Sequence, residues 1–141
     1  MDFGSINWLA VVACVVVSMI VGSVWFSQKT FFPVWWKAIG RSEKDAPGMQ
    51  NMGMTWALTA LSSFVQAVFM ALMVNVMGSV TPGGATLGSG ALTGFMLWLG
   101  FVAPTGLTNK LFAGQLKAWL LEAGNHLIDF VLFGAILGAW R

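Results

Sequence analysis

The chain has 141 residues, of which 57% are hydrophobic and only 9% charged, with a formal net charge of +2. This composition excludes an ordinary soluble domain and indicates a single membrane domain over residues 1–141, built from helices because its long apolar runs do not alternate. The small positive charge forms no basic stripe interleaved with exposed aromatic residues, so nucleic acid is not expected as a partner.

The first predicted span covers residues 6–26. The residues before it lack the basic region and the small-residue cleavage site of a signal peptide, so we expect this span to be retained. The single cysteine, Cys14, lies inside the apolar run, which favours a buried, inert thiol over a reactive one. Cys14, Ser18 and Gly22 form a stripe of small residues, which either packs within the chain or pairs two copies of it.

The connection after the first span mixes aromatic and basic side chains. Pro33 and Gly40 favour the start and the stop of a short helix. Such a helix would lie in the membrane interface, with its aromatic rings at the acyl boundary and its basic groups among anionic lipid headgroups. The expected interfacial anchors are Trp35, Trp36, Lys37 and Arg41. The alternative is an aromatic-rich loop packed on the helix bundle.

Three further spans are predicted, at residues 55–77, 91–107 and 116–140. They meet or approach the roughly 20 helical residues that cross a hydrocarbon core of about 30 Å. The third is the shortest and is interrupted by glycines and by Pro104. An uncharged, turn-rich segment, 78–90, precedes it. Gly90 and Gly94 form a second small-residue stripe, for which packing within the chain and dimer formation are again both open.

Basic residues are distributed unevenly among the connections. The first and third connections carry six of the seven Lys and Arg residues, and the second carries none. These six are Lys29, Lys37, Arg41, Lys44, Lys110 and Lys117. Because cytoplasmic loops are enriched in Lys and Arg, we expect the first and third connections to be cytoplasmic and both termini to lie outside.

Polar residues interrupt the fourth span and recur in the second. The fourth contains Glu122, Asn125, His126 and Asp129, and the second contains Thr59, Ser62, Ser63 and Gln66. At about 100° per residue, each set occupies one face of its helix. An unpaired acidic side chain at membrane depth costs roughly 2.5–3.5 kcal/mol. We therefore expect the two faces to point into the bundle and toward each other.

The two polar sets match one another along the sequence. An offset of 63 residues pairs Trp56 with Trp119 and each polar residue of one set with a polar residue of the other. An offset of 81 aligns the ends of the first and third spans, 27–31 and 108–112, and the 18 extra residues fall in the first connection. The pattern predicts two pseudo-symmetric helical hairpins related by an axis along the membrane normal. Chance similarity between apolar helices is the alternative.

Three functional interpretations of the polar residues remain open. In the first, the protein is a structural or accessory subunit whose helices the polar face holds together, and the candidate hydrogen-bond partners are Gln66, Ser62, Ser63, Asn7 and Ser18. In the second, Glu122, His126 and Asp129 relay protons or hold a cation in a transporter-like or channel-like protein. That interpretation favours a homo-oligomer, in the simplest case a dimer, because four helices scarcely enclose an aqueous route.

The third interpretation is a membrane enzyme that uses the carboxylates and His126 as acid–base groups or metal ligands. It is the weakest, because the chain has one histidine and the nearest acids lie on the same helix, whereas a closed metal site takes ligands from several elements. No nucleophile motif and no phosphate-binding glycine loop occurs in the sequence. We therefore predict no metal, no cofactor and no catalytic residue.

Six short segments share a recognisable pattern, at residues 7–10, 22–27, 99–103, 108–112, 123–127 and 134–141. The most distinctive reads Ala-Gly-Asn-His-Leu at 123–127. These segments resemble the small bacterial membrane proteins grouped as domain of unknown function 1761, along nearly the whole chain. Where that family ends its first span with Trp-Tyr-Ser-Pro, this chain has Phe26 and Gln28 at the tyrosine and proline positions. The resemblance implies a four-span protein of the bacterial cytoplasmic membrane, with no established activity.

Overall fold

The structure of the protein is a computed structural model that describes residues 2–45 and 52–141. In chain order its elements are a 3-10 turn (η1, Phe3–Ser5), α1 (Trp8–Trp25), α2 (Phe32–Ala38), α3 (Met52–Val80), α4 (Leu87–Leu97), a π-helical turn (η3, Trp98–Val102), α5 (Ala103–Phe112) and α6 (Leu116–Ala139). The described residues form helices and no strands. Within them, four helices are long and apolar enough to cross a membrane, counting Leu87–Phe112 as one. The prediction of an all-α chain with four such helices is confirmed.

The third long helix exceeds its predicted range of 91–107 at both ends. Thr86 caps its start: the Thr86 side chain accepts from Ser89 N at 3.2 Å, and the Ser89 side chain accepts from Thr86 N at 2.8 Å. This capping box satisfies backbone donors that a helix start otherwise leaves unpaired. The start of this helix was not predicted because Gly88 and Gly90 lie close to it, and glycine has a low helix propensity.

The same helix also continues through Pro104, where an interruption was predicted. Proline has no N–H to donate, and its ring clashes with the carbonyl of a regular preceding turn. The backbone widens just before it into the π-helical turn, in which Ala103 N donates to Trp98 O. The widened turn keeps α4 and α5 in one continuous helix.

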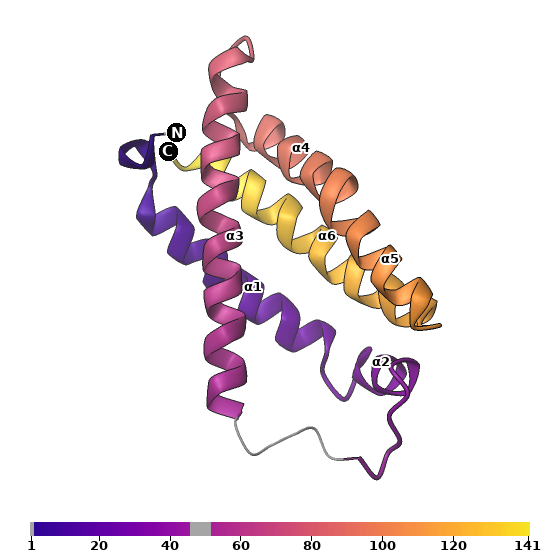
Figure 1. Cartoon of the computed structure of the whole chain (residues 1–141). Helices are drawn as coiled ribbons and strands as arrows, with labels where there is room; N and C mark the ends of the chain where they lie inside the picture. The colour runs from indigo at the N-terminus through magenta and orange to yellow at the C-terminus, as the bar shows by residue number, and fades with distance from the viewer. Residues whose placement is uncertain (1, 46–51) are drawn as a thin grey trace.

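The four long helices run back and forth between two ends of the molecule (Figure 1). The termini lie side by side at one end, where Asn7 Nδ2 donates to Trp140 O at 3.4 Å and Arg141 Nη2 donates to Asn75 Oδ1 at 3.3 Å. Helix α2 and the turn between α5 and α6 lie at the other end. The first and third connections, which carry most of the basic residues, therefore share one end of the molecule.

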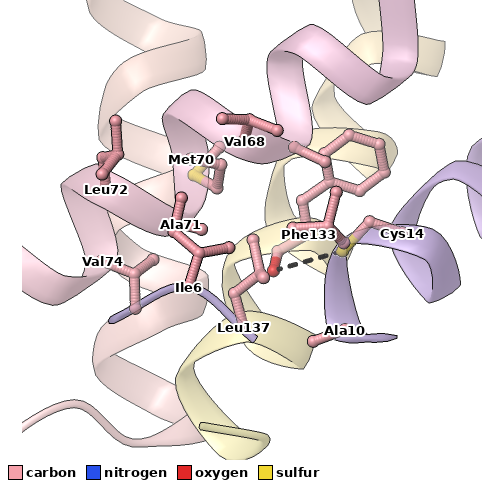
Figure 2. Packing of buried hydrophobic residues seen from close by; sticks show 12 residues of the cluster. Ile6, Ala10, Cys14, Val68, Met70, Ala71, Leu72, Val74, Phe133 and Leu137 are labelled. Carbon is pink, nitrogen blue, oxygen red and sulfur yellow. Dashed lines mark hydrogen bonds between the residues drawn. The ribbon is translucent and has the colours of Figure 1, made fainter. Parts of the chain in front are cut away.

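The apolar core lies where α1, α3 and α6 cross (Figure 2). Phe133 and Cys14 are fully buried within it, and Cys14 Sγ lies 4.0 Å from Phe133 O. The buried thiol agrees with the prediction from the sequence. The core consists of Ile6, Ala10, Val11, Cys14, Ala67, Val68, Met70, Ala71, Leu72, Val74, Phe133 and Leu137.

Helices α4 and α6 approach one another backbone to backbone. A Cβ atom on Gly90 would overlap the carbonyl oxygen of Gly134, and one on Gly94 would overlap that of Phe130. The reverse also holds, because a Cβ on Gly134 would overlap the Gly90 carbonyl oxygen. The small-residue stripe at Gly90 and Gly94 therefore packs against α6 of the same chain. For this stripe, packing within the chain is the correct one of the two alternatives.

Candidate functional site

Asp129 is the centre of a buried polar cluster at the meeting of α1, α3 and α6. Its Oδ2 accepts from Ser18 Oγ at 3.1 Å and from Asn125 Nδ2 at 3.4 Å, and the hydroxyl oxygens of Ser18 and Ser63 lie 3.0 Å apart. The exposed fractions of the four residues run from 3% for Asp129 to 8% for Ser18. We call Ser18, Ser63, Asn125 and Asp129 the interior cluster. It joins polar residues of three helices that are distant in sequence.

The protonation state of Asp129 decides the direction of the hydrogen bonds in the interior cluster. An ionised carboxylate only accepts, so Ser18 gives its single hydroxyl hydrogen to Asp129, and Ser63 must then donate to Ser18. The result is a row of donors from Ser63 through Ser18 to Asp129. When Asp129 carries a proton it becomes a donor itself, and the row can reverse.

No basic side chain neutralises Asp129 within the described part of the chain. In the described part of the chain, the ion pair joins Lys110 to Glu122 and does not involve Asp129. Asp129 Oδ1 and Asn125 Oδ1 are buried and have no hydrogen-bond partner among the described residues. Buried polar atoms are nearly always paired, so two such oxygens in one cluster require an explanation.

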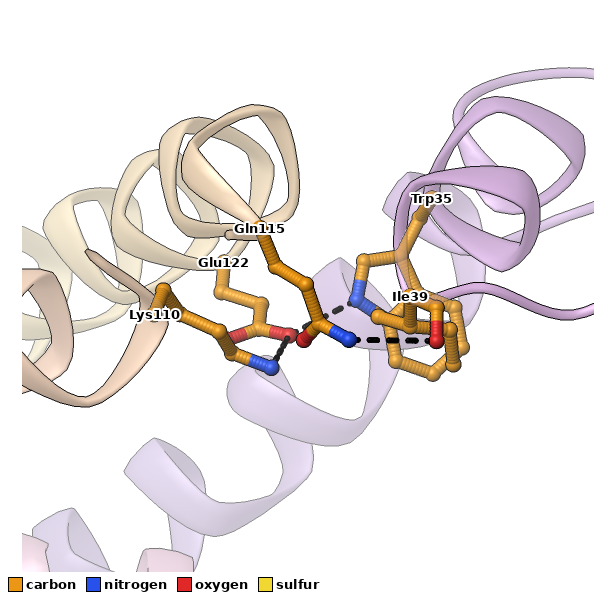
Figure 3. Close-up of polar contacts among 5 residues, drawn as sticks. All are labelled: Trp35, Ile39, Lys110, Gln115 and Glu122. Carbon is orange, nitrogen blue, oxygen red and sulfur yellow. Dashed lines mark hydrogen bonds and ion pairs between the residues drawn. The ribbon is translucent and has the colours of Figure 1, made fainter. Parts of the chain in front are cut away.

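Glu122 and His126 line a separate cleft between η3–α5 and α6, with a volume of about 360 Å³. Glu122 Oε1 pairs with Lys110 Nζ at 3.0 Å and accepts from the Trp35 indole Nε1 at 2.8 Å. Figure 3 shows Lys110 and Trp35 converging on this carboxylate from α5 and α2. The Nδ1 atom of His126 is buried without a partner among the described residues. The four polar residues of the fourth span, predicted as one site, therefore divide between the interior cluster and this cleft.

Of the second-span set, only Ser63 belongs to the interior cluster, and Ser18 of α1 links it to Asp129 of α6. Thr59 and Ser62 are exposed; Thr59 Oγ1 donates to Thr55 O, and Gln66 Nε2 donates to Ser62 Oγ, all on the same helix. The expectation that Thr59, Ser62 and Gln66 face the fourth-span set is not met. The reason is that the first half of α3 diverges from the other helices (Figure 1), so residues 52–59 are all exposed.

The burial of α3 and α6 does not follow the 63-residue offset. Asn125 is 7% exposed, whereas its counterpart Ser62 is exposed. Asp129 is 3% exposed, whereas its counterpart Gln66 is half-buried. The polar match in the sequence is thus not reproduced as equivalent environments.

The short helix predicted in the first connection is present as α2. Pro33 lies in its first turn, and Gly40 follows its end with a φ of +84°, a conformation that glycine adopts readily. Besides the Trp35 contact, Gln115 Nε2 donates to Ile39 O at 3.2 Å, so α2 packs on the bundle at two points. Its placement in a lipid interface remains a prediction.

Basic and acidic groups meet in an open cleft of about 620 Å³ beside α2. Lys37, Arg41 and Lys117 line it together with Glu43 and Asp45. The Arg41 guanidinium lies over the Trp36 ring, 5.7 Å from the centroid. The pKa of the exposed Asp45 carboxyl is held below its usual value, chiefly because Ser42 N donates to it at 2.7 Å. These cations come from α2, the segment after it and the start of α6.

Ser18 and Lys110 complete these contacts but are not among the predicted site residues, although Ser18 is one of the five candidate hydrogen-bond partners named from the sequence. The signal for Ser18 is a hydroxyl in an otherwise aliphatic run, Val15-Val-Val-Ser-Met-Ile20, which would be costly in lipid without a partner. Nothing in the sequence assigns Lys110 to Glu122. Among the described residues, no three His, Cys, Asp or Glu side chains come together in a way that could hold a metal ion.

The described residues define an all-helical protein with four helices long and apolar enough to cross a membrane and with a polar cluster enclosed by three of them. The chain belongs to the family described as "Protein of unknown function (DUF1761)", whose model matches residues 9–138. The family resemblance seen in the sequence is thereby confirmed over nearly the whole chain. No curated protein and no solved structure matches the chain.

Proposed function

We propose that the protein is a multi-pass protein of the bacterial cytoplasmic membrane, transporter-like or channel-like, in which the interior cluster binds a proton or a small polar solute in transit. The observation that carries this proposal is Asp129: a carboxyl group 3% exposed, hydrogen-bonded by a hydroxyl and an amide, and without a cation within reach in the described chain. Ionisable residues inside membrane helices mark ion pathways and proton relays.

The rival function is structural, and the same cluster favours it in one respect: it ties α1, α3 and α6 together. Neutral side chains would serve that purpose, however, whereas an acidic one costs roughly 2.5–3.5 kcal/mol at membrane depth when unpaired. Asp129 Oδ1 and Asn125 Oδ1 also lack a hydrogen-bond partner among the described residues. Such free acceptors favour a cluster that binds and releases a proton or a solute over one that is purely structural. For these reasons we place transport first, a structural or accessory subunit second and an enzyme third.

The proposed arrangement in the membrane rests on charge. The end that carries α2 and the third connection holds most Lys and Arg residues, so it lies in the cytoplasm, and both termini lie outside. At that end, Lys37, Arg41 and Lys117 bind anionic lipid headgroups, and Trp35 and Trp36 anchor α2 in the interface.

The two hairpins, α1 with α3 and α4–α5 with α6, are in this proposal related by rotation. In support, α3 and α6 contact each other, α1 contacts both of them, and α4 also contacts both. An axis between α3 and α6 would relate these contacts in pairs, although α4 packs more closely on α6 than α1 does on α3. A second copy of the chain completes the route for the solute. It binds through a surface other than Gly90 and Gly94, which face α6.

Substitution of Asp129 tests the function. Asp129→Asn keeps the size and the hydrogen-bonding oxygen but removes the titratable charge. In liposomes with an internal pH dye, we expect this variant to reduce proton flux driven by a pH gradient at least tenfold, with an unchanged melting temperature. Asp45→Asn is the matched control, because Asp45 is exposed and far from the interior cluster along the chain.

Two results would reject transport. One is equal flux through the parent protein and Asp129→Asn. The other is a parent protein whose flux equals that of empty liposomes, together with a lowered melting temperature in Asp129→Asn, which would leave the structural function.

A further inference from the structure

The cleft between α5 and α6 has the dimensions and the walls of a small-molecule site. Its volume of about 360 Å³ lies at the lower end of the range for such sites, roughly 300–1,000 Å³. One wall is the Trp119 indole, fixed because its Nε1 donates to Ala103 O at 2.9 Å and because Gly106 leaves room for the ring. Phe101 and Val102 add apolar surface toward η3.

Polar groups are spaced along this cleft. Thr105 and Asn109 lie about one helical turn apart on α5, and Glu122 and His126 lie about one turn apart on α6. From Trp119 to His126 the helix rises about 10 Å at 1.5 Å per residue. The ligand therefore meets an apolar wall, hydrogen-bonding side chains and one carboxylate within the length of a small molecule.

The ion pair with Lys110 indicates that the Glu122 carboxylate can bind an ammonium group. The Lys110 ammonium lies 3.0 Å from Glu122 Oε1, the same oxygen that accepts from Trp35 Nε1, and Glu122 itself lines the cleft. The side chains are 24% and 28% exposed. Ion pairs with this much solvent access are weak, so the exchange of one ammonium group for another costs little.

We propose that this cleft binds a small organic ammonium ion with an apolar or aromatic body, whose charged group replaces Lys110 at Glu122. The carboxylate selects a cation, and the walls of Trp119, Phe101 and Val102 select an organic one, because aromatic rings attract organic cations and apolar surface does not attract a hydrated metal ion. An anion would face Glu122 without compensation once Lys110 was displaced. This site is independent of the function proposed for the interior cluster.

Calorimetric titration of the full chain in detergent tests the proposal, with benzylamine as the cation and benzyl alcohol as its uncharged match. We expect benzylamine to bind at least tenfold more tightly than benzyl alcohol and Glu122→Gln to lose at least tenfold in affinity. Lys110→Met should bind benzylamine at least fivefold more tightly than the parent, because the internal competitor is gone. Lys117→Met removes the same charge at the same end of the molecule outside this cleft, and its affinity should not change.

The opposite effects of the two cleft substitutions separate a ligand site from a structural ion pair. Loss of a structural pair would lower stability in both Glu122→Gln and Lys110→Met and would raise affinity in neither. Equal binding of benzyl alcohol, or equal affinities of Lys110→Met and Lys117→Met, would overturn the proposal. If Glu122→Gln does not fold, the comparison of the two lysine variants decides alone. Asp129→Asn should bind benzylamine like the parent, so failure of the transport proposal leaves this one testable.

Discussion

The hydroxyl hydrogen of Ser18 decides how the residues of the interior cluster depend on one another. When Asp129 is ionised, Ser18 donates to its carboxylate and accepts from Ser63, so the two serines make different bonds although their hydroxyl oxygens lie 3.0 Å apart. A hydrogen bond to a charged group contributes about 1.5–3 kcal/mol, and one between neutral groups about 0.5–1.5 kcal/mol. The position of Asp129 inside the bundle was predictable from the cost of charge in lipid. Its partner was predicted only as one of several candidates, Ser18 among them, because helix crossing decides which of these residues meets it.

Adjacent serines on α3 provide a test of this network. Ser63→Ala removes the hydrogen-bond partner of Ser18 in a buried position, and we expect it to lower the free energy of unfolding by about 1 kcal/mol. Ser62→Ala changes an exposed residue whose side chain, among the described residues, accepts from Gln66 alone, so its effect should stay within about 0.5 kcal/mol. Chemical denaturation in detergent measures both. Similar losses in the two variants would contradict the network.

At the scale of helices, the contact between α4 and α6 is the closest in the structure described. Gly94 follows Gly90 by four positions, Gly138 follows Gly134 by four positions, and the two pairs face each other across the contact. Small residues at this spacing allow helix backbones to approach, which made the stripe predictable. Its partner was not predictable, because the spacing does not say whether the facing helix belongs to the same chain. The π-helical turn was not predictable either, because a proline at position 104 is equally consistent with the end of a helix.

Glycine substitutions separate this contact from general helix stability. In Gly134→Ala the new Cβ meets the Gly90 backbone, which cannot rotate away, so we expect a loss of about 3 kcal/mol, the upper end of the cost of overpacking. Gly22→Ala is the control: it lies on α1 with nothing within 4 Å of the new Cβ. Alanine there should gain about 0.5–1 kcal/mol from better helix propensity. Thermal unfolding distinguishes the two, and a stable Gly134→Ala would show that the helices do not touch.

The whole molecule has two chemically different ends. One end brings together the termini and the uncharged turn between α3 and α4, and the other brings together α2 and the turn before α6. The number of long helices and the charge difference between the ends were predictable, because apolar length and loop charge are local properties of the sequence. The division of the polar residues of α6 between two sites was not, because it depends on α3 diverging on one side of α6 while α5 stays close on the other.

Single-cysteine variants test the orientation of these ends. In a Cys14→Ser background, Ser79→Cys and Lys117→Cys place a thiol at exposed positions near opposite ends. We expect a membrane-impermeant maleimide to label Ser79→Cys in intact cells, and Lys117→Cys only after the membrane is permeabilised. The parent protein serves as control, because Cys14 is fully buried and should stay unlabelled. Labelling of both variants from one side would refute the proposed topology.

The π-helical turn has a geometric consequence for the side chains that follow it. Residues of this long helix that meet α6 include Gly90, Gly94, Trp98, Ala103 and Gly106, with the Trp98 indole donating to Ala123 O and the Ala103 carbonyl accepting from Trp119. The intervals are four, four, five and three residues, and the interval of five coincides with the widened turn. That additional residue corrects the rotational drift of the helix by about 100°. Thr105 and Asn109 consequently border the cleft beside α6, so a backbone adjustment required by one proline also sets the chemistry of a surface several residues away.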